Sequence, residues 1–274
     1  MLKQHLDLVL REDPLFRKYW RSLGWRGRRH ARALATTIDQ MALPNNICYL
    51  SESQRGRRYL SCIPQKDLEY GRRPQDWPEF VADHQAKSEL YKIAYKDLWQ
   101  FLKERIKDGS IRLYGGLKPE TSLDANLGKL KHGTAARQRL RDTWDVVRFR
   151  VVTRDLSLLR DVGIDIWQAY LDEIVRCRNY YLQPKGDSNL DSYRALHFEI
   201  EIVPQRWIEL QVLTEARDLV GYLDYSVSFK MLLPPVSDGH LRWLQDFSLK
   251  ANIFDYQAIQ SSSLRLRDAN TRGF

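Results

Sequence analysis

The sequence predicts an α+β fold in which helices flank a mixed β-sheet, with a basic N-terminal extension and a C-terminal helix. Segments with apolar residues at helical spacing alternate along the chain with short β-branched runs. Two of these runs, 197–203 and 207–213, are separated only by Pro204-Gln205-Arg206, which favours an antiparallel pair. The chain has 274 residues, of which 43% are hydrophobic, so it is large and apolar enough to bury a core.

The first part of the chain predicts helices, a hairpin and a linker, in that order. Residues 1–42 have mostly helical spacing, which Gly24 and Gly27 interrupt. Two apolar runs on either side of a polar SESQRG predict a short hairpin around 46–63. Residues 64–80 hold three prolines and a glycine and predict a loop or linker.

Helices and strands then alternate through the rest of the chain. Apolar residues recur at helical spacing from 86 to 107, and Asp108-Gly109-Ser110 predicts the end of that helix. The segments expected after it are a strand at 111–118, a helix at 122–131, a strand at 145–153, a helix at 155–174, strands at 197–203 and 207–213, and helices at 214–230 and 240–254. We therefore expect three parts: a basic extension over 1–80, a central domain over 81–235 and a helical tail over 236–274.

Composition excludes several classes of protein. No apolar run approaches eighteen residues, so no membrane span is expected, and the acidic start does not resemble a targeting peptide. The three cysteines form no CxxC pair, which argues against a disulfide framework or a structural zinc site. Cys48 and Cys62 would face each other across the expected hairpin as free thiols. These features predict a soluble, cytoplasmic protein.

Positive charge is concentrated near the N-terminus. The whole chain carries a net charge of +9, and residues 1–75 contain 15 basic and 7 acidic side chains. Residues 17–32 hold seven basic side chains and three aromatic ones without an acid, a mixture that suits phosphate contacts and base stacking. The alternative is a solvated helical face with Trp20 and Trp25 in the core.

Two acids stand out among the expected strands. Asp145 opens one strand, and Glu209 lies on the polar face of another, opposite Ile208 and Leu210. Carboxylates at such positions suit Mg²⁺, although a structural role is the alternative. No Walker A, GxGxxG or nucleophile-elbow pattern is present, so P-loop, Rossmann and α/β-hydrolase functions lack support.

Three segments, in this order, resemble the synthetase domain of the RelA/SpoT family. They are DVVRFRV (145–151), PKGDSNLDSYRALH (184–197) and IELQVLT (208–214), against family patterns of D-x-x-G-x-R-[VI], P-K-x-N-G-Y-R-S-L-H and E-[IV]-Q-[IV]-R-T. Upstream, LKPETSL (117–123) is similar to the family's R-V-K-x-x-x-S segment. Downstream, Asp218 and Phe229-Lys230 fit the helix that follows the glutamate strand. The resemblance covers about 88–232.

This resemblance implies a nucleotidyltransferase-like sheet and an alarmone pyrophosphokinase that moves the β,γ-pyrophosphate of ATP to a ribose 3′-hydroxyl and releases AMP. It implies that Asp145 and Glu209 hold Mg²⁺, that Glu209 helps to deprotonate the attacking hydroxyl, and that Arg150 stacks on the adenine. The residues implied for the ATP phosphates are Lys118, Ser122 and Lys129. Those implied for the acceptor are Lys185, Tyr193, Arg194, His197 and Gln211.

The sequence departs from the family's patterns at several motif positions. Gly116 stands where the family has an arginine beside the adenine, and Arg112 or Tyr114 are the candidates to replace it. The other departures are Arg148 for a glycine, DSYRA (191–195) for N-G-Y-R-S, Leu213 for an arginine and Tyr225 for a histidine.

Three functions remain open at this point. The first is alarmone synthesis on a free guanine or adenine nucleotide such as GDP or GTP. The second is pyrophosphate transfer to the 3′ end of tRNA, as in toxic family members that are paired with an antitoxin protein; the basic N-terminal segment favours it. The third is a degenerate fold that binds nucleotide or RNA without catalysis.

Overall fold

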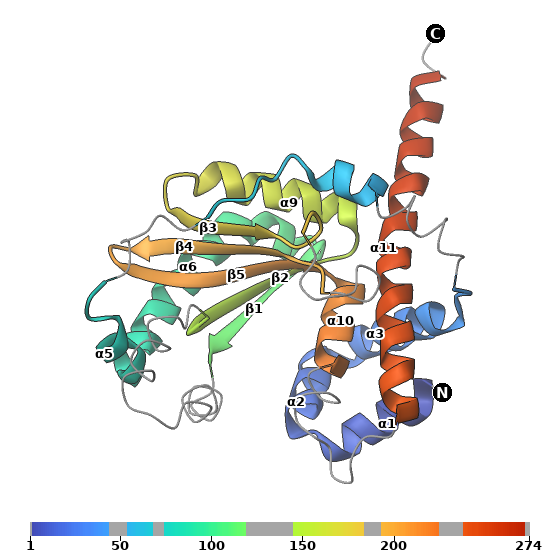
Figure 1. The fold of residues 1–274 in the computed structure, drawn as a ribbon, viewed down its shortest axis with the longest axis horizontal. Helices are drawn as coiled ribbons and strands as arrows, with labels where there is room; N and C mark the ends of the chain where they lie inside the picture. The colour runs from blue at the N-terminus through green and yellow to red at the C-terminus, as the bar shows by residue number, and fades with distance from the viewer. Residues whose placement is uncertain are drawn as a thin grey trace.

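In a computed structural model, the residues described are 2–43, 54–67, 74–118, 145–183, 193–224 and 238–271. Within them, five strands form one mixed sheet with helices on one side and at one end (Figure 1). The elements are α1 (Leu2–Glu12), α2 (Pro14–Ser22), α3 (Gly24–Gln40), α5 (Trp77–Ala82), α6 (His84–Lys107), β1 (Ile111–Leu117), β2 (Val147–Thr153), α9 (Leu156–Ala169), β3 (Ile174–Asn179), β4 (Leu196–Val203), β5 (Arg206–Thr214), α10 (Glu215–Asp224) and α11 (Asp238–Thr271). The α+β class is confirmed.

The sheet has the strand order β1-β2-β5-β4-β3. β2 and β5 are parallel, and the other neighbouring pairs are antiparallel. A parallel pair cannot be joined by a tight turn, and here α9 and the β3–β4 pair lie between its two strands in the chain. The strands that carry the two acid motifs are therefore neighbours at the centre of the sheet.

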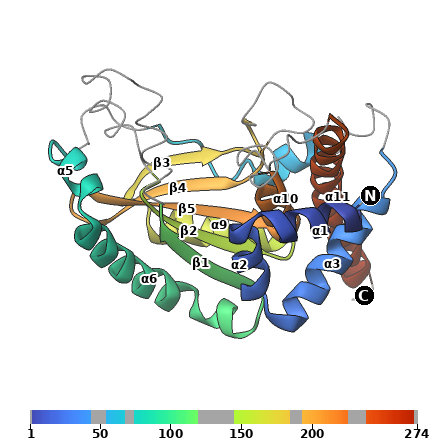
Figure 2. The ribbon, with the colours of Figure 1, turned by 90° about the horizontal axis from the view of Figure 1, so that it is seen from below.

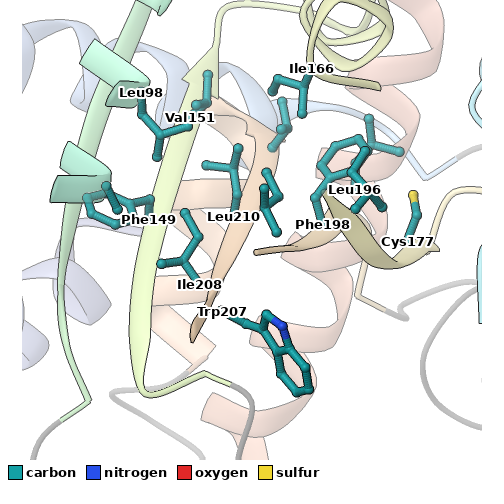
Figure 3. Close-up of a cluster of buried hydrophobic side chains, with 14 of the residues drawn as sticks. Leu98, Phe149, Val151, Ile166, Cys177, Leu196, Phe198, Trp207, Ile208 and Leu210 are labelled. Carbon is teal, nitrogen blue, oxygen red and sulfur yellow. The ribbon is translucent and has the colours of Figure 1, made fainter. Parts of the chain in front are cut away.

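One face of the sheet is apolar and is covered by α6 and α9. Phe149 of β2 and Leu210 of β5 point into this core with Leu98 of α6 and Ile166 of α9 (Figure 3). Each such side chain contributes about 1.5–3 kcal/mol on burial. The approach of α9 is close enough that a Cβ on its Gly163 would lie 2.5 Å from an Ile63 methyl carbon.

The helix α6 shows how local sequence sets this arrangement. Asp83 caps it by accepting hydrogen bonds from the backbone N–H groups of Gln85 and Ala86, at 2.8 and 3.1 Å. The side chains at 90, 94, 98 and 102 recur every four residues and are all buried. The helix ends at Lys107 with Asp108 as its C-cap, and the next residue is Gly109, whose φ of 73° favours glycine.

A second buried cluster joins the N-terminal helices to α10 and α11. Phe16 and Trp20 of α2 pack with Leu219 of α10 and Phe247 of α11. Both views show these helices beyond the same end of the sheet (Figures 1 and 2). The basic segment is thus a packed helical unit next to the sheet. The division into 1–80, 81–235 and 236–274 stays a prediction.

The expected hairpin is wrong in its described part, and the loop or linker expected over 64–80 is confirmed for 64–67 and 74–76 but wrong for 77–80, which are helical. Residues 54–60 are helical, because Leu60 and Ile63 enter the main core and Asn179 Nδ2 donates to both of their carbonyl oxygens. Trp77, expected in the linker, is fully buried in α5 and packs against Trp207 with the ring centroids 5.4 Å apart.

The expected helix over 155–174 is too long. It ends at Ala169, and Ile174–Asn179 form the edge strand β3, which the sequence analysis missed. The expected helix over 214–230 is confirmed for Glu215–Asp224. The expected helix over 122–131 and Cys48 lie outside the described residues. Within the part of the chain that the structure describes, no helix is long and apolar enough to cross a membrane.

Candidate active site

The second face of the sheet carries polar side chains in two rows that cross several strands. Because side chains alternate along a strand, residues paired across the ladder share a face. The first row is Tyr114, Arg150, Gln211, His197 and Arg178. The second row is Gly116, Arg148, Glu209, Glu199 and Arg176. The strand order thus places four of the expected site residues next to one another, namely Arg150, Gln211, His197 and Glu209.

Glu209 is a buried carboxylate that contacts His197 and Gln211 and lies near the charge of Arg148. Its Oε1 lies 2.8 Å from His197 Nδ1, and its Oε2 accepts a hydrogen bond from Gln211 Nε2 at 2.9 Å. Burial alone would raise its pKa, but the charge and hydrogen bond of His197 and the charge of Arg148 outweigh burial and lower the pKa to about 2. Glu209 is therefore ionised at neutral pH.

His197 links Glu209 to the expected acceptor-binding tyrosine. The Tyr193 hydroxyl lies 2.9 Å from His197 Nε2, and the two rings meet edge to face. Nδ1 thus faces Glu209 and Nε2 faces Tyr193, so each ring nitrogen of His197 has one hydrogen-bond partner. Burial raises the pKa of Tyr193. The tyrosine is therefore a hydrogen-bond donor at neutral pH.

Arg150 is fixed in position from two sides. Its Nε donates to Gln211 Oε1 at 2.9 Å, and its Nη1 lies 3.2 Å from the buried carboxylate of Asp218. The guanidinium also lies over the ring of Tyr222, 5.1 Å from the centroid. A side chain held this way keeps its plane in one orientation, which stacking on a base requires.

Asp218 ties this site to the N-terminal helices. Its Oδ2 accepts a hydrogen bond of 3.1 Å from the hydroxyl of Tyr19 in α2, and its Oδ1 accepts one from Tyr114. The Tyr19 ring stacks on Tyr222 at 3.7 Å. Burial and the charge of Asp218 raise the pKa of Tyr19. The second helical cluster thus supports the residues that position Arg150.

Asp145 lies just before β2 and contacts two cations. Lys118 Nζ is 2.6 Å from its Oδ1, and Arg148 Nη1 is 3.5 Å from its Oδ2. If side chains alternated strictly back from Arg150, Asp145 would lie on the other face of the sheet. Asp145 precedes β2, however, so the alternation of strand side chains does not determine where its side chain points. Arg148 therefore lies beside both Asp145 and Glu209.

The two carboxylates fit a magnesium ion in their chemistry. Mg²⁺ prefers oxygen ligands and is commonly held by one or two carboxylates together with substrate phosphates. Among the described residues, no group of three or more His, Cys, Asp or Glu side chains is placed to hold a metal ion. A magnesium ion at Asp145 or Glu209 would therefore need further oxygen ligands from a bound molecule.

One expected site residue lies elsewhere. Arg194 is buried, with its Nε 3.4 Å from the hydroxyl of Tyr256 in α11, so it does not join the polar face. Four positions lie outside the described residues, namely Ser122, Lys129, Lys185 and Tyr225.

The departure at Leu213 changes the end of the polar face. Leu213 is buried with Val152 and Ala195, and this small cluster packs against Tyr114 and Tyr193. A buried apolar contact thus lies beside Tyr193 at the position where the family's pattern has an arginine.

Several polar residues of this face were missed from the sequence. Arg176 forms an ion pair with Glu199, and the Tyr180 ring packs edge to face on His197. The alternation of HFEIEIV does place Glu199 on the same face as His197. Arg176 has no comparable signal in the sequence, because its short strand directly follows a segment with helical spacing.

The described geometry defines an α+β protein whose mixed sheet presents a polar, charge-rich face. No family model and no curated protein matches its sequence. Solved structures do match. The small alarmone synthetase 1 from Bacillus subtilis is 17% identical, with 71% of this chain and 100% of that chain covered and a TM-score of 0.51. The same enzyme bound to its product pppGpp is 20% identical, with 68% and 100% covered and a TM-score of 0.50.

The protein thus has the fold of the small alarmone synthetases. This finding confirms, at the level of the fold, the resemblance that the motifs indicate.

Proposed function

We propose that the protein is a pyrophosphokinase that transfers the β,γ-pyrophosphate of ATP to the 3′-hydroxyl of a guanine or adenine nucleotide. The observation that carries the proposal is the array of Glu209, Gln211, His197 and Arg150 on one face of the sheet, with Asp145 at its edge. The fold of the small alarmone synthetases supports it, and one of these enzymes is seen with pppGpp as its product.

In this reaction the acceptor's 3′ oxygen bonds to the β-phosphorus of ATP. The bond from that phosphorus to the oxygen bridging the α-phosphate breaks, AMP leaves with the bridging oxygen, and the hydroxyl proton passes to water. Such transfers depend chiefly on alignment and charge neutralisation. A magnesium ion held by Asp145 and Glu209 would neutralise charge on the phosphate oxygens.

The chain's own residues would bind and orient both nucleotides. Arg150, fixed by Gln211 and Asp218, would stack on the adenine, and Lys118 would contact the donor phosphates. Tyr193 would stack on the acceptor base. Glu209 would contribute mainly charge and the orientation of His197, since a carboxylate of low pKa is a weak proton acceptor at neutral pH.

Label transfer from γ-labelled ATP tests this function. The purified protein is mixed with Mg²⁺ and, separately, with GDP, GTP, AMP, ADP or bulk tRNA, and the products are separated by thin-layer chromatography. We expect label in a slow-migrating nucleotide, and loss of transfer in Asp145→Asn and Glu209→Gln. Asp161→Asn, an exposed carboxylate of α9, is the matched control. Transfer at the wild-type rate in either site variant would refute the roles of the two acids.

A specific observation favours tRNA as a second candidate acceptor. A groove of about 480 Å³ on α2 and α3 is lined by Arg21, Arg28, Arg29 and Arg32. Trp25 also lines the groove and is 67% exposed. The alternative prediction, in which Trp20 and Trp25 both lie in the core, is therefore wrong for Trp25. Arg29 lies over the Trp25 ring at 5.8 Å. Exposed aromatic and basic side chains together suit a polyanion with accessible bases.

Labelled, acid-precipitable tRNA in the same assay would support this second function. The triple variant Arg26→Ala, Arg28→Ala and Arg29→Ala is then expected to bind tRNA more weakly and with a shallower salt dependence. Lys107→Ala, an exposed cation at the far end of α6, is the control. Unchanged affinity and salt slope in the triple variant would exclude the groove. Binding of nucleotide without any transfer would indicate the non-catalytic alternative.

A further inference from the structure

The C-terminal helix α11 meets the end of β5 through a buried carboxylate. Asp255 of α11 is 2% exposed, and its Oδ2 accepts a hydrogen bond of 2.7 Å from the hydroxyl of Thr214. Thr214 is the last residue of β5 and is fully buried. Because a buried polar group that loses its partner costs free energy, this contact fixes the orientation of the Thr214 hydroxyl.

The same hydroxyl caps the helix that follows β5. Thr214 Oγ1 accepts a hydrogen bond of 3.3 Å from the backbone N–H of Arg217, three residues further on, which is the arrangement of an N-cap. The helix α10 accordingly begins at Glu215. Since the Thr214 hydroxyl donates to Asp255 while it accepts from Arg217, a residue of α11 helps to fix the point at which α10 begins.

A second contact ties the first turn of α10 to α11. The Arg217 side chain is buried, and its Nη1 donates to the backbone oxygen of Ser248 at 3.2 Å and to the Ser248 hydroxyl at 3.1 Å. Burial lowers the pKa of Arg217, and the nearby charge of Asp255 acts in the opposite direction. Both views show α10 beside α11 at this end of the sheet (Figures 1 and 2).

The other side of the same turn holds an arginine of the candidate active site. Asp218 follows Arg217, is fully buried and lies 3.2 Å from Arg150 Nη1. Successive residues of a helix point about 100° apart, so Arg217 faces α11 while Asp218 faces β2. One turn of α10 therefore connects Asp255 on one side with Arg150 on the other.

We propose that Asp255 is a positioning residue of the nucleotide site, which fixes the start of α10 through Thr214 and thereby places Asp218 against Arg150. The proposal rests on the proposed function, in which Arg150 stacks on the adenine of ATP. It adds to that site a residue of α11, outside the segment that carries the motifs. Asp255 itself contacts neither nucleotide, so its effect passes through Arg150.

Binding of α,β-methylene ATP, whose cleavable bridge is blocked, tests the proposal. Asp255→Ala leaves the Thr214 hydroxyl without its acceptor and is expected to bind the analogue about 2- to 30-fold more weakly, the range for substitutions that act on a site through other residues. Asp246→Ala, at an exposed carboxylate of the same helix, is the matched control and is expected to bind like the wild type. Thermal unfolding shows whether each variant is folded.

Two measurements separate positioning from a general loss of folded protein. In Asp255→Asn the side-chain oxygen still accepts from Thr214, and the site tolerates a neutral group, because burial raises the pKa of Asp255 to about 7. This variant is expected to bind the analogue within about threefold of the wild type, as for one weakened hydrogen bond. In the label-transfer assay, Asp255→Ala is expected to raise the KM for ATP with little change in kcat, whereas a smaller folded fraction would lower kcat alone.

A double-mutant cycle tests whether the effect passes through Arg150. Arg150→Ala is expected to weaken binding of the analogue by itself, because the proposed function gives this residue a direct contact with the base. Adding Asp255→Ala to it is expected to weaken binding by no more than about a further twofold, since two residues that act as one unit do not add. Two full and independent losses would show that Asp255 does not act through Arg150.

The outcomes distinguish this inference from the proposed function. If the wild type binds the analogue and transfers label while Asp255→Ala binds it normally, the positioning role is overturned and the proposed function stands. Independent losses in the double variant, an unchanged KM with a lowered kcat, or an Asp255→Asn variant as weak as Asp255→Ala would also overturn the positioning role alone. A wild-type protein that neither binds the analogue nor transfers label would overturn the proposed function and this inference with it.

Discussion

Replacing Glu209 by Gln is expected to change how the protein's stability depends on pH. The carboxylate has a pKa lowered to about 2 in the folded protein, from an ordinary value of 4.5. At about 1.4 kcal/mol for each pKa unit, this difference corresponds to about 3 kcal/mol of stability. A glutamine has the same shape but no titrating group, so it removes this contribution.

The sign follows from the lowered pKa. A carboxyl group that is more acidic in the folded state stabilises the fold fully above its unfolded pKa, and this stabilisation is lost as the pH falls through the folded pKa. The window in which Glu209 acts is therefore between about pH 4.5 and about pH 2. The size of the stabilisation depends on His197, Arg148 and Gln211, which stabilise the ionised form of Glu209 in the folded protein.

Urea denaturation of the wild type and Glu209→Gln across this window measures the effect. The difference in free energy of unfolding between the two proteins is expected to shift by about 3 kcal/mol against the wild type as the pH falls. Asp161→Asn, at an exposed carboxylate, is expected to keep a nearly constant difference from the wild type. A constant difference for Glu209→Gln as well would refute the reasoning, because Glu209 would then have the same pKa in both states.

Two other substitutions test the packing that supports the site. Gly163→Ala is expected to lower the free energy of unfolding by about 1–3 kcal/mol, because its Cβ would lie 2.5 Å from an Ile63 methyl carbon; unchanged stability in urea would show that α9 can move away. Tyr19→Phe is expected to cost about 1 kcal/mol, since the Asp218 carboxylate loses one donor, and to weaken binding of an ATP analogue through Arg150. If Tyr19→Phe bound the analogue as tightly as the wild type, the N-terminal helices would not support the nucleotide site.

The strands and the long helix could be predicted from local sequence, and the places where prediction failed have a physical explanation. The helix α6 carries its own cap and its own apolar stripe, so its signal is local. Residues 54–60 carry no such signal. They are helical because Asn179, far away in the chain, satisfies the carbonyl groups at their end. The edge strand β3 is short and follows a helix directly, so its boundary depended on the pairing with β4.

The order of the motifs, the acids Asp145 and Glu209, and the family whose fold they indicate can be predicted from the amino-acid sequence, because motif residues and side-chain alternation are properties of short segments. Folding was needed to show that Arg148 pairs with Gly116, that Arg194 lies in the core and that Tyr19 contacts Asp218. These contacts join residues far apart in the chain, and which partners meet is set by strand order and by the packing of the second helical cluster.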